Sequence, residues 1–207
     1  MNRAKVAYFD TMATMPWAAD PFGPEEQPKI ARLLAAAEIR PGVCILEPGC
    51  GTGRLTAILA DATGPTGRVL ALDISAKMVT ACRDRIGQRQ NVQVLQAALE
   101  DSAVEPAIFD VAVCHQVYPH FEDKAAALTA LVRGLKLGGR LLVVHFTNAA
   151  VVNEIHRTAA GPIQQDRLPP PVEMRRLLTE AGLVVDRCSD DSLGYLVRGM
   201  RLGPVES

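Results

Sequence analysis

The residues of this chain whose types and spacing most clearly could do chemistry are an acidic residue and three alternating glycines: Glu47, Gly49, Gly51 and Gly53. They follow the apolar run 43–46 and precede a segment with apolar residues at helical spacing, so they lie in a predicted strand-to-helix turn. Glycine in such a turn lets the backbone approach a ligand closely. A second apolar run ends in Asp73, whose carboxylate suits the two hydroxyls of a ribose. The pattern predicts a nucleoside-binding βαβ unit.

The spacing of the glycines argues against a dinucleotide as the ligand. The dinucleotide pattern G-x-G-x-x-G needs its third glycine one position later, where this chain has Arg54. The Glu47 carboxylate is also unfavourable beside a pyrophosphate, whereas it suits a cation. The array E-x-G-x-G-x-G resembles motif I of the class I S-adenosylmethionine-dependent methyltransferases, whose cofactor has a sulfonium and an α-ammonium but no phosphate. A nicotinamide enzyme is the alternative interpretation of the same unit.

The resemblance implies a role for each residue near the predicted turn. Glu47, the three glycines and Cys50 would line the methionine and ribose portion of S-adenosylmethionine, and Asp73 would bind the ribose hydroxyls. Ile74 and Met78 would pack on the adenine. The simpler interpretation of Asp73 is a carboxylate that only starts the next helix.

Other predicted cofactor contacts come from segments further along and before the turn. The family often has an aspartate after the third strand, but this chain has Ala98 there. Ala98 and Leu99 are expected to bind adenine through the backbone, with Glu100 as an alternative carboxylate. Cys114 and His115 are expected to approach the methionine moiety through their carbonyls. Tyr8 and Trp17 resemble the segment that caps the cofactor in small-molecule members; a loose aromatic surface contact is the alternative.

All four histidines fall where the family places its methyl acceptor: His115, His120, His145 and His156. Imidazole titrates near neutral pH, so it can act as a general base, a hydrogen-bonding group or a metal ligand. Taken singly, each has a simpler interpretation as a packing or capping residue. We expect His145 to be the first candidate for a general base and His120 the second. The spacing of the histidines is not that of a metal-ligand set, so no metal is expected.

The elements that must position these residues alternate along the chain. Apolar spacing predicts strands near 43–47, 68–73, 91–95, 109–114, 140–145, 183–189 and 194–201. It predicts helices from about Pro28, near 53–63, from Ser75, near 123–136 and near 149–159, and a last helix that holds Met174 to Ala181. Ser75 is expected to cap a helix. The first 27 residues, broken by prolines and glycine, are expected to be irregular. Alternating βαβ units predict an α/β fold, with a doubly wound and mostly parallel sheet. Two consecutive terminal strands predict one antiparallel strand, as in the seven-stranded Rossmann-like sheet of the class I family.

The length and composition are those of one globular domain over residues 1–207. Within it, residues 1–40 are expected to form an N-terminal cap and helix, and residues 146–172 an acceptor-side lid. A solvated helix with a connector is the alternative for the second segment.

Bulk properties exclude several classes of partner and compartment. The formal charge of −1 gives no basic footprint, so no nucleic-acid partner is expected. No apolar run approaches the roughly 20 residues that span a bilayer, so no membrane partner is expected. Five cysteines without C-x-x-C spacing and an N-terminus without a signal-like apolar stretch predict a reduced, cytoplasmic protein. A homodimer is left open.

Together these features predict an enzyme that transfers a methyl group from S-adenosylmethionine to O, S or N of a small-molecule acceptor. Two alternatives from other classes stay open. One is a non-catalytic S-adenosylmethionine-binding module, and the other is a protein or RNA methyltransferase.

Overall fold

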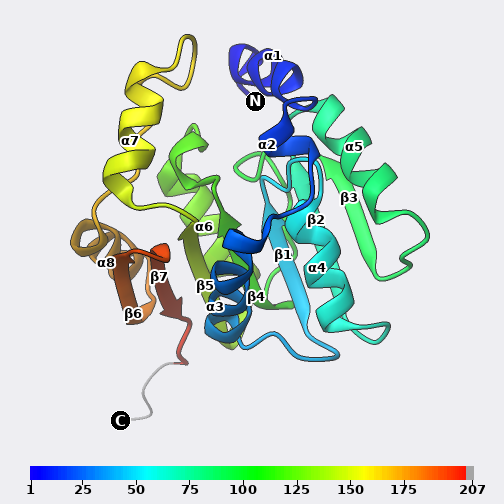
Figure 1. Ribbon diagram of the computed structural model, residues 1–207. Coiled ribbons are helices and arrows are strands. Elements are labelled where there is room, and N and C mark those ends of the chain that lie inside the picture. The colour runs from blue at the N-terminus through cyan, green and yellow to red at the C-terminus, as the bar shows by residue number, and fades with distance from the viewer. Residues whose placement is uncertain (204–207) are drawn as a thin grey trace.

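The computed structural model describes residues 1–203, and a seven-stranded sheet lies at its centre (Figure 1). The strands follow the order β3-β2-β1-β4-β5-β7-β6. Their bounds are β1 Cys44–Pro48, β2 Arg68–Asp73, β3 Val92–Gln96, β4 Phe109–His115, β5 Leu135–His145, β6 Val184–Asp191 and β7 Gly194–Met200. All neighbours pair in parallel except β7, which is antiparallel to both β5 and β6. The predicted α/β class, the doubly wound sheet and its one antiparallel strand are confirmed.

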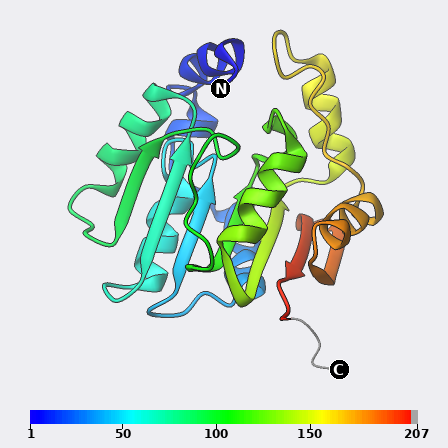
Figure 2. The ribbon, with the colours of Figure 1, turned by 180° about the vertical axis from the view of Figure 1, so that it is seen from behind.

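Helices cover both faces of this sheet. Three of them, α3 Gln27–Ala37, α4 Arg54–Thr63 and α5 Ala76–Ile86, lie on the face nearer the viewer in Figure 1. On the opposite face, seen in Figure 2, lie α6 Lys124–Gly134 and α8 Pro171–Glu180. The remaining helices, α1 Arg3–Met12, α2 Pro16–Ala19 and α7 Ala149–Thr158, lie around the carboxyl ends of the strands. Within residues 1–203, no helix has both the length and the apolar character needed to cross a bilayer.

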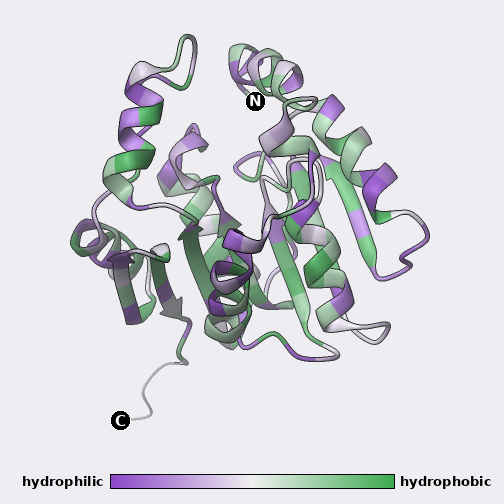
Figure 3. Cartoon of the chain, viewed as in Figure 1, coloured by the Kyte–Doolittle hydropathy of each residue, from purple (hydrophilic) through white to green (hydrophobic). Residues whose placement is uncertain are grey.

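The apolar core consists of two layers, one on each face of the sheet. In β1, Ile45 packs with residues of α3 and α4, whereas the next residue, Leu46, packs with residues of α6 and α8. Successive strand residues point to opposite faces, so a strand covered on both sides must be apolar throughout. The central strands accordingly form a continuous hydrophobic block in Figure 3. This is why the buried strands are visible in the sequence as uninterrupted apolar runs.

The expectation that the first 27 residues are irregular is wrong. They contain α1, α2 and the 3-10 turn η1 Pro24–Glu26. Asn2 caps α1, because its side-chain oxygen accepts hydrogen bonds from the backbone N–H groups of Ala4 and Lys5 at 3.0 and 3.2 Å. The helix carries no strong apolar face, and its Lys5 is buried by residues far away in the sequence. The position of α1 therefore depends on tertiary contacts and not on an apolar face of its own.

Most predicted element bounds agree with the structure to within a few residues. Ser75 caps α5 as expected, since its hydroxyl accepts from the N–H of Met78 at 3.1 Å. The largest difference concerns β5, which begins at Leu135 rather than near Arg140. Leu135 pairs with Phe109 of β4, ahead of a register shift, so the additional residues join the sheet by an irregular pairing.

Two glycines of positive φ allow a test of close backbone packing. Gly194 begins β7 at φ +97°, and a Cβ there would lie 2.2 Å from the carbonyl oxygen of His145. Gly138 has φ +79°, and a Cβ there would meet open space. We expect Gly138→Ala to lower the free energy of unfolding by about 1 kcal/mol, the cost of a left-handed alanine. Gly194→Ala should cost roughly 3 kcal/mol or more, because overlap with the backbone adds to that strain.

Urea unfolding of both variants, followed by circular dichroism, measures this difference. Equal losses for the two variants would contradict the interpretation. They would mean that only the backbone conformation at Gly194, and not its contact with β5, sets the cost.

Candidate functional site

A cavity of about 630 Å³ opens at the carboxyl ends of the parallel strands, within the size range of small-molecule sites. It lies where β1 has β2 on one side and β4 on the other, the switch point at which doubly wound sheets bind ligands. Fourteen of the sixteen predicted site residues line it: Tyr8, Trp17, Glu47, Gly49, Cys50, Gly51, Asp73, Ile74, Met78, Ala98, Leu99, His115, His120 and His145.

The other two predicted residues, Gly53 and Cys114, are not among the residues that line the cavity. Gly53 precedes α4 at φ +82°, and a Cβ there would lie 2.8 Å from the Sγ of Cys82 in α5. This glycine therefore allows α4 and α5 to pack closely. Cys114 is fully buried in the core layer beneath α6 and α8, and this burial raises the pKa of its thiol. Its side chain fills the core.

Glu47 is the most unusual group of the site. Its side chain is buried, and its Oε2 has no hydrogen-bond partner among the described residues. Burial raises the pKa of this carboxyl to about 8, although a hydrogen bond with Thr56 opposes the shift. The carboxyl is therefore mostly protonated at pH 7. A buried acid without a partner is costly unless a ligand supplies one.

Asp73 binds the backbone of the glycine turn after β1. One carboxylate oxygen accepts from the N–H of Gly51 and the other from the N–H of Ser75, both at 2.9 Å. Asp73 thus holds the glycine turn against the start of α5 while it lines the cavity. Burial raises the pKa of this carboxyl against the opposing effect of the two backbone hydrogen bonds. The simpler interpretation, a carboxylate that starts a helix, is therefore true of Asp73 as well.

The helix α2 is fastened over the glycine turn by its own carbonyl groups. The carbonyl oxygens of residues 17–19 accept hydrogen bonds from the side chains of Arg54, Thr52 and Arg85 respectively. Arg54 also pairs with Glu26 at 3.1 Å. Arg54 stands where the dinucleotide pattern has its third glycine. Its side chain instead binds the segment before β1, at Trp17 and Glu26. Sequence reasoning missed these contacts, because Arg54 lies 37 residues from Trp17 and 28 residues from Glu26.

The residues after β3 that are predicted to bind adenine also lie at the cavity. Ala98 and Leu99 line the cavity where the family often has an acidic side chain. Glu100 also lines it, but its Oε1 accepts from the backbone N–H of Glu122 at 2.8 Å. The carboxylate of Glu100 is therefore engaged with the loop after β4.

All four histidines line the same cavity, and three of them are held uncharged. Burial, helped by the positive charge of Arg54, lowers the pKa of His115 to about 3. Burial lowers the pKa of His145 well below its usual value, and the neighbouring histidines add to this effect. Burial likewise lowers the pKa of His156. Among residues 1–203, no group of three or more acidic, cysteine or histidine side chains is arranged to hold a metal ion.

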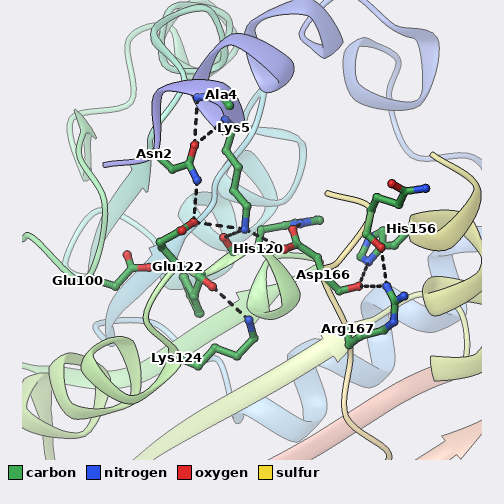
Figure 4. A network of polar contacts seen from close by, with 12 residues as sticks. Asn2, Ala4, Lys5, Glu100, His120, Glu122, Lys124, His156, Asp166 and Arg167 are labelled. Carbon is green, nitrogen blue, oxygen red and sulfur yellow. Dashed lines mark hydrogen bonds and ion pairs between the residues drawn. The ribbon is translucent and has the colours of Figure 1, made fainter. Parts of the chain in front are cut away.

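The fourth histidine, His120, belongs to a network of charges (Figure 4). Its Nδ1 lies 2.7 Å from Oδ2 of Asp166, and the Nζ of Lys5 donates to Oδ1 of the same carboxylate at 2.8 Å. Lys5 also donates to the His120 carbonyl at 3.0 Å. Burial opposes ionisation of Asp166, but the hydrogen bonds from His120 and Lys5 hold its pKa below the usual value. Sequence reasoning placed Asp166 only within the predicted lid over residues 146–172 and did not single out Lys5.

Comparison with known proteins gives a matching family and several relatives. Residues 46–143 match the family model described as "Methyltransferase domain". The ubiquinone/menaquinone biosynthesis C-methyltransferase UbiE of Ectopseudomonas mendocina is 39% identical over 112 residues, which are 53% of this chain and 44% of the relative. UbiE of Idiomarina loihiensis is 30% identical over 171 residues, 80% of this chain and 62% of the relative. The chain thus spans less than two thirds of the length of these relatives.

Solved structures show the same fold. The N-methyltransferase NodS of Bradyrhizobium japonicum, in complex with S-adenosyl-L-homocysteine, superposes with a TM-score of 0.73 over 96% of this chain and 98% of its own, at 18% identity. The magnesium protoporphyrin IX methyltransferase ChlM of Synechocystis, with the same product bound, gives a TM-score of 0.68 over 95% of this chain and 97% of its own, at 20% identity.

The resemblance inferred from the acid and glycine array is confirmed by these comparisons, since the matched residues begin within β1 and continue through the glycine turn to β5. The matched part of the chain, residues 46–143, is therefore a methyltransferase domain.

Proposed function

We propose that the chain is an enzyme that binds S-adenosylmethionine and transfers its methyl group to a small-molecule acceptor. The observation that carries this proposal is the cavity itself. Beside β1 it presents a glycine turn and the buried acid Glu47, whose Oε2 has no partner among the described residues, and beside β4 and β5 a set of histidines among apolar side chains. The first end suits a cationic nucleoside and the second an uncharged acceptor.

The residues present fit the proposed cofactor. An α-ammonium group would supply the missing partner of Glu47, and the ribose hydroxyls would share Asp73 with the backbone N–H groups that it already binds. Gly51 has φ +54°, and a Cβ there would meet open space, so the backbone at this position can be approached closely. Ile74 and Met78 offer apolar surface for an adenine. When bound, S-adenosylmethionine supplies a methyl group already activated by its sulfonium.

The other end of the cavity favours an acceptor without net charge. Its apolar lining includes Phe121, Val152, Ile155 and Ile163. The histidines whose pKa values are lowered by burial add hydrogen-bonding groups rather than charges. The named relatives are C-methyltransferases of quinone biosynthesis, so an aromatic hydroxyl compound belongs among the acceptors to test. The methylated atom is then O, S or N, or a ring carbon activated by loss of a hydroxyl proton.

Of the two candidate bases, the geometry favours His120 over His145. A general base must become charged when it accepts a proton. Protonation of His145 is opposed by its burial and by the three other histidines around it. His120 instead has its Nδ1 2.7 Å from Oδ2 of Asp166, so that a carboxylate lies beside its ring. We therefore assign the base to His120 and reverse the order expected from the sequence.

The structure gives less support to the alternatives. The lysine and arginine side chains that line the cavity, Lys5 and Arg54, are both paired with carboxylates, so they offer no basic groove for RNA or an acidic protein. A non-catalytic module would have no use for a second, histidine-lined end of the cavity. The sequence-based division into a cap over residues 1–40 and a lid over residues 146–172 remains our proposal. Side chains of both segments line the cavity. The cytoplasmic location stays a prediction.

The first test of the proposed function concerns Glu47. The free carboxyl is protonated at pH 7, and a cationic ligand favours its ionised form, so binding must release a proton. The affinity for S-adenosylhomocysteine should therefore rise between pH 6 and 7.5. Glu47→Gln should abolish the proton release and weaken binding by about 10-fold or more, because one charge-assisted hydrogen bond is lost.

Calorimetry in buffers of different ionisation enthalpy measures the released protons directly. Glu154→Gln is the control, because this carboxylate lies on the exposed face of α7 in an ion pair with Arg157. If the unmodified protein released no proton on binding and Glu47→Gln bound with unchanged affinity, Glu47 would be removed from the site.

The second test separates the two candidate bases. His120→Ala should keep its affinity for S-adenosylhomocysteine and lose about 10²–10⁴-fold in turnover, because only the proton transfer is removed. His145→Ala should lose far less turnover. Release of S-adenosylhomocysteine is measured with a panel of probes: 1,4-naphthoquinol, catechol, a thiophenol and an aniline. Loss of turnover in His145→Ala but not in His120→Ala would restore His145 as the base.

A further inference from the structure

Asp166 lies behind two residues that line the cavity, Lys5 and His120, and is anchored through both its side chain and its backbone. Its two carboxylate oxygens bind Lys5 and His120. Its backbone is held as well, since its N–H donates to the carbonyl of Ile163 at 2.9 Å and its own carbonyl accepts from Nδ1 of His156 at 3.1 Å. Only 8% of its side chain is exposed. A buried carboxylate is stable only when its charge and lone pairs are satisfied, as they are here.

This arrangement determines which nitrogen of His120 carries the proton. An ionised carboxylate can only accept hydrogen bonds, so the Nδ1–H of His120 must be the donor to Asp166. The neutral ring then has its lone pair on Nε2. No hydrogen bond from residues 1–203 reaches that nitrogen, and the side chain of His120 lines the cavity. The atom that can accept a proton is therefore the one left free.

We propose that Asp166 is a positioning residue that fixes His120 in the tautomer whose Nε2 accepts the proton of the methyl acceptor, and that Lys5 sets the orientation of Asp166. The inference rests on the proposed function and adds to it a residue that the methyltransferase family does not imply. In the proton transfer, the bond from the acceptor atom to hydrogen breaks and Nε2–H forms. The electron pair stays on the acceptor atom, and Asp166 remains ionised beside the new imidazolium.

The positioning group is assembled from three separate parts of the chain. Lys5 belongs to α1, His120 to the 3-10 turn η2 Tyr118–His120, and Asp166 to the segment after α7. Lys5 and Asp166 are 161 residues apart, and Asp166 and His120 are 46 apart (Figure 4). The tautomer of His120 is therefore fixed only when α1 and the segment after α7 both lie against the loop after β4.

Asp166→Asn is an isosteric test of this proposal, because Lys5 dictates how the new amide must turn. The Lys5 ammonium has only donors, so it binds the amide oxygen, and the amide NH₂ then faces Nδ1 of His120. Nδ1 must become the acceptor, and the proton moves to Nε2. We expect a neutral His120 with Nε2–H and a loss of turnover of roughly 10²-fold or more, because this tautomer cannot accept a proton.

A double variant tests the role of Lys5 in orienting residue 166. In Lys5→Met/Asp166→Asn the amide is free to turn its oxygen towards His120, which should restore the Nδ1–H tautomer and recover part of the turnover. Glu154→Gln is again the matched control, a carboxylate changed to an amide on α7 with no contact to His120. It should leave both the tautomer and the turnover unchanged.

The tautomer is read from the ¹⁵N resonances of the His120 ring, which distinguish a protonated from an unprotonated nitrogen without any turnover. Turnover is followed with the acceptor probe that reacts best, and S-adenosylhomocysteine affinity is measured on each variant. An Nε2–H tautomer in the unmodified protein, or an unchanged tautomer in Asp166→Asn, would overturn the proposal even if the double variant failed to fold. If instead the unmodified protein binds no S-adenosylhomocysteine, the proposed function fails while the tautomer measurement stands.

Discussion

The cost of burying ionisable groups around one cavity is the constraint on which the rest of this structure depends. A charge removed from water must be neutralised or paired. Three of the histidines meet this requirement by staying uncharged, whereas Asp166 meets it by binding both Lys5 and His120. Glu47 is a buried acid whose Oε2 has no hydrogen-bond partner among the described residues, and burial raises the pKa of its carboxyl. The acids around the cavity thus differ: Glu47 can still accept a charged partner, whereas the charge of Asp166 is already satisfied.

The backbone at the switch point obeys a second constraint, that of close approach. The turn after β1 needs positive φ at Gly49, Gly51 and Gly53, but the reasons differ. A Cβ at Gly49 would lie 2.3 Å from Val117, and one at Gly53 would meet Cys82, whereas one at Gly51 would meet only open space. The outer two glycines therefore allow the loop after β4 and the helix α5 to pack, and the middle one leaves room for a ligand. One sequence pattern thus combines packing with binding.

The N-terminal segment joins the two ends of the cavity. Residues 17–19 of α2 are fastened to the glycine turn and α5, while Lys5 of α1 reaches the segment after α7. Neither helix would be stable alone, since α2 is a single turn and α1 has no strong apolar face. Their order depends on side chains contributed by the rest of the domain. One short segment of chain therefore contacts both the glycine turn and the carboxylate that binds His120.

The sequence by itself determined the βαβ unit with its acid and glycine array, the approximate places of the seven strands and the apolar runs of the central ones, because each is a short-range pattern set by backbone geometry and by burial on both faces of a sheet. It also gathered the histidines at one rim, since the carboxyl ends of parallel strands meet there. It did not reveal the helices α1 and α2, or the contacts for which we prefer His120 to His145 as the base. Those depended on contacts such as that between Lys5 and Asp166, which lie 161 residues apart. Only the folded chain decides which charges are buried together, because the cost of burying a charge depends on its surroundings in space and not on its neighbours in sequence.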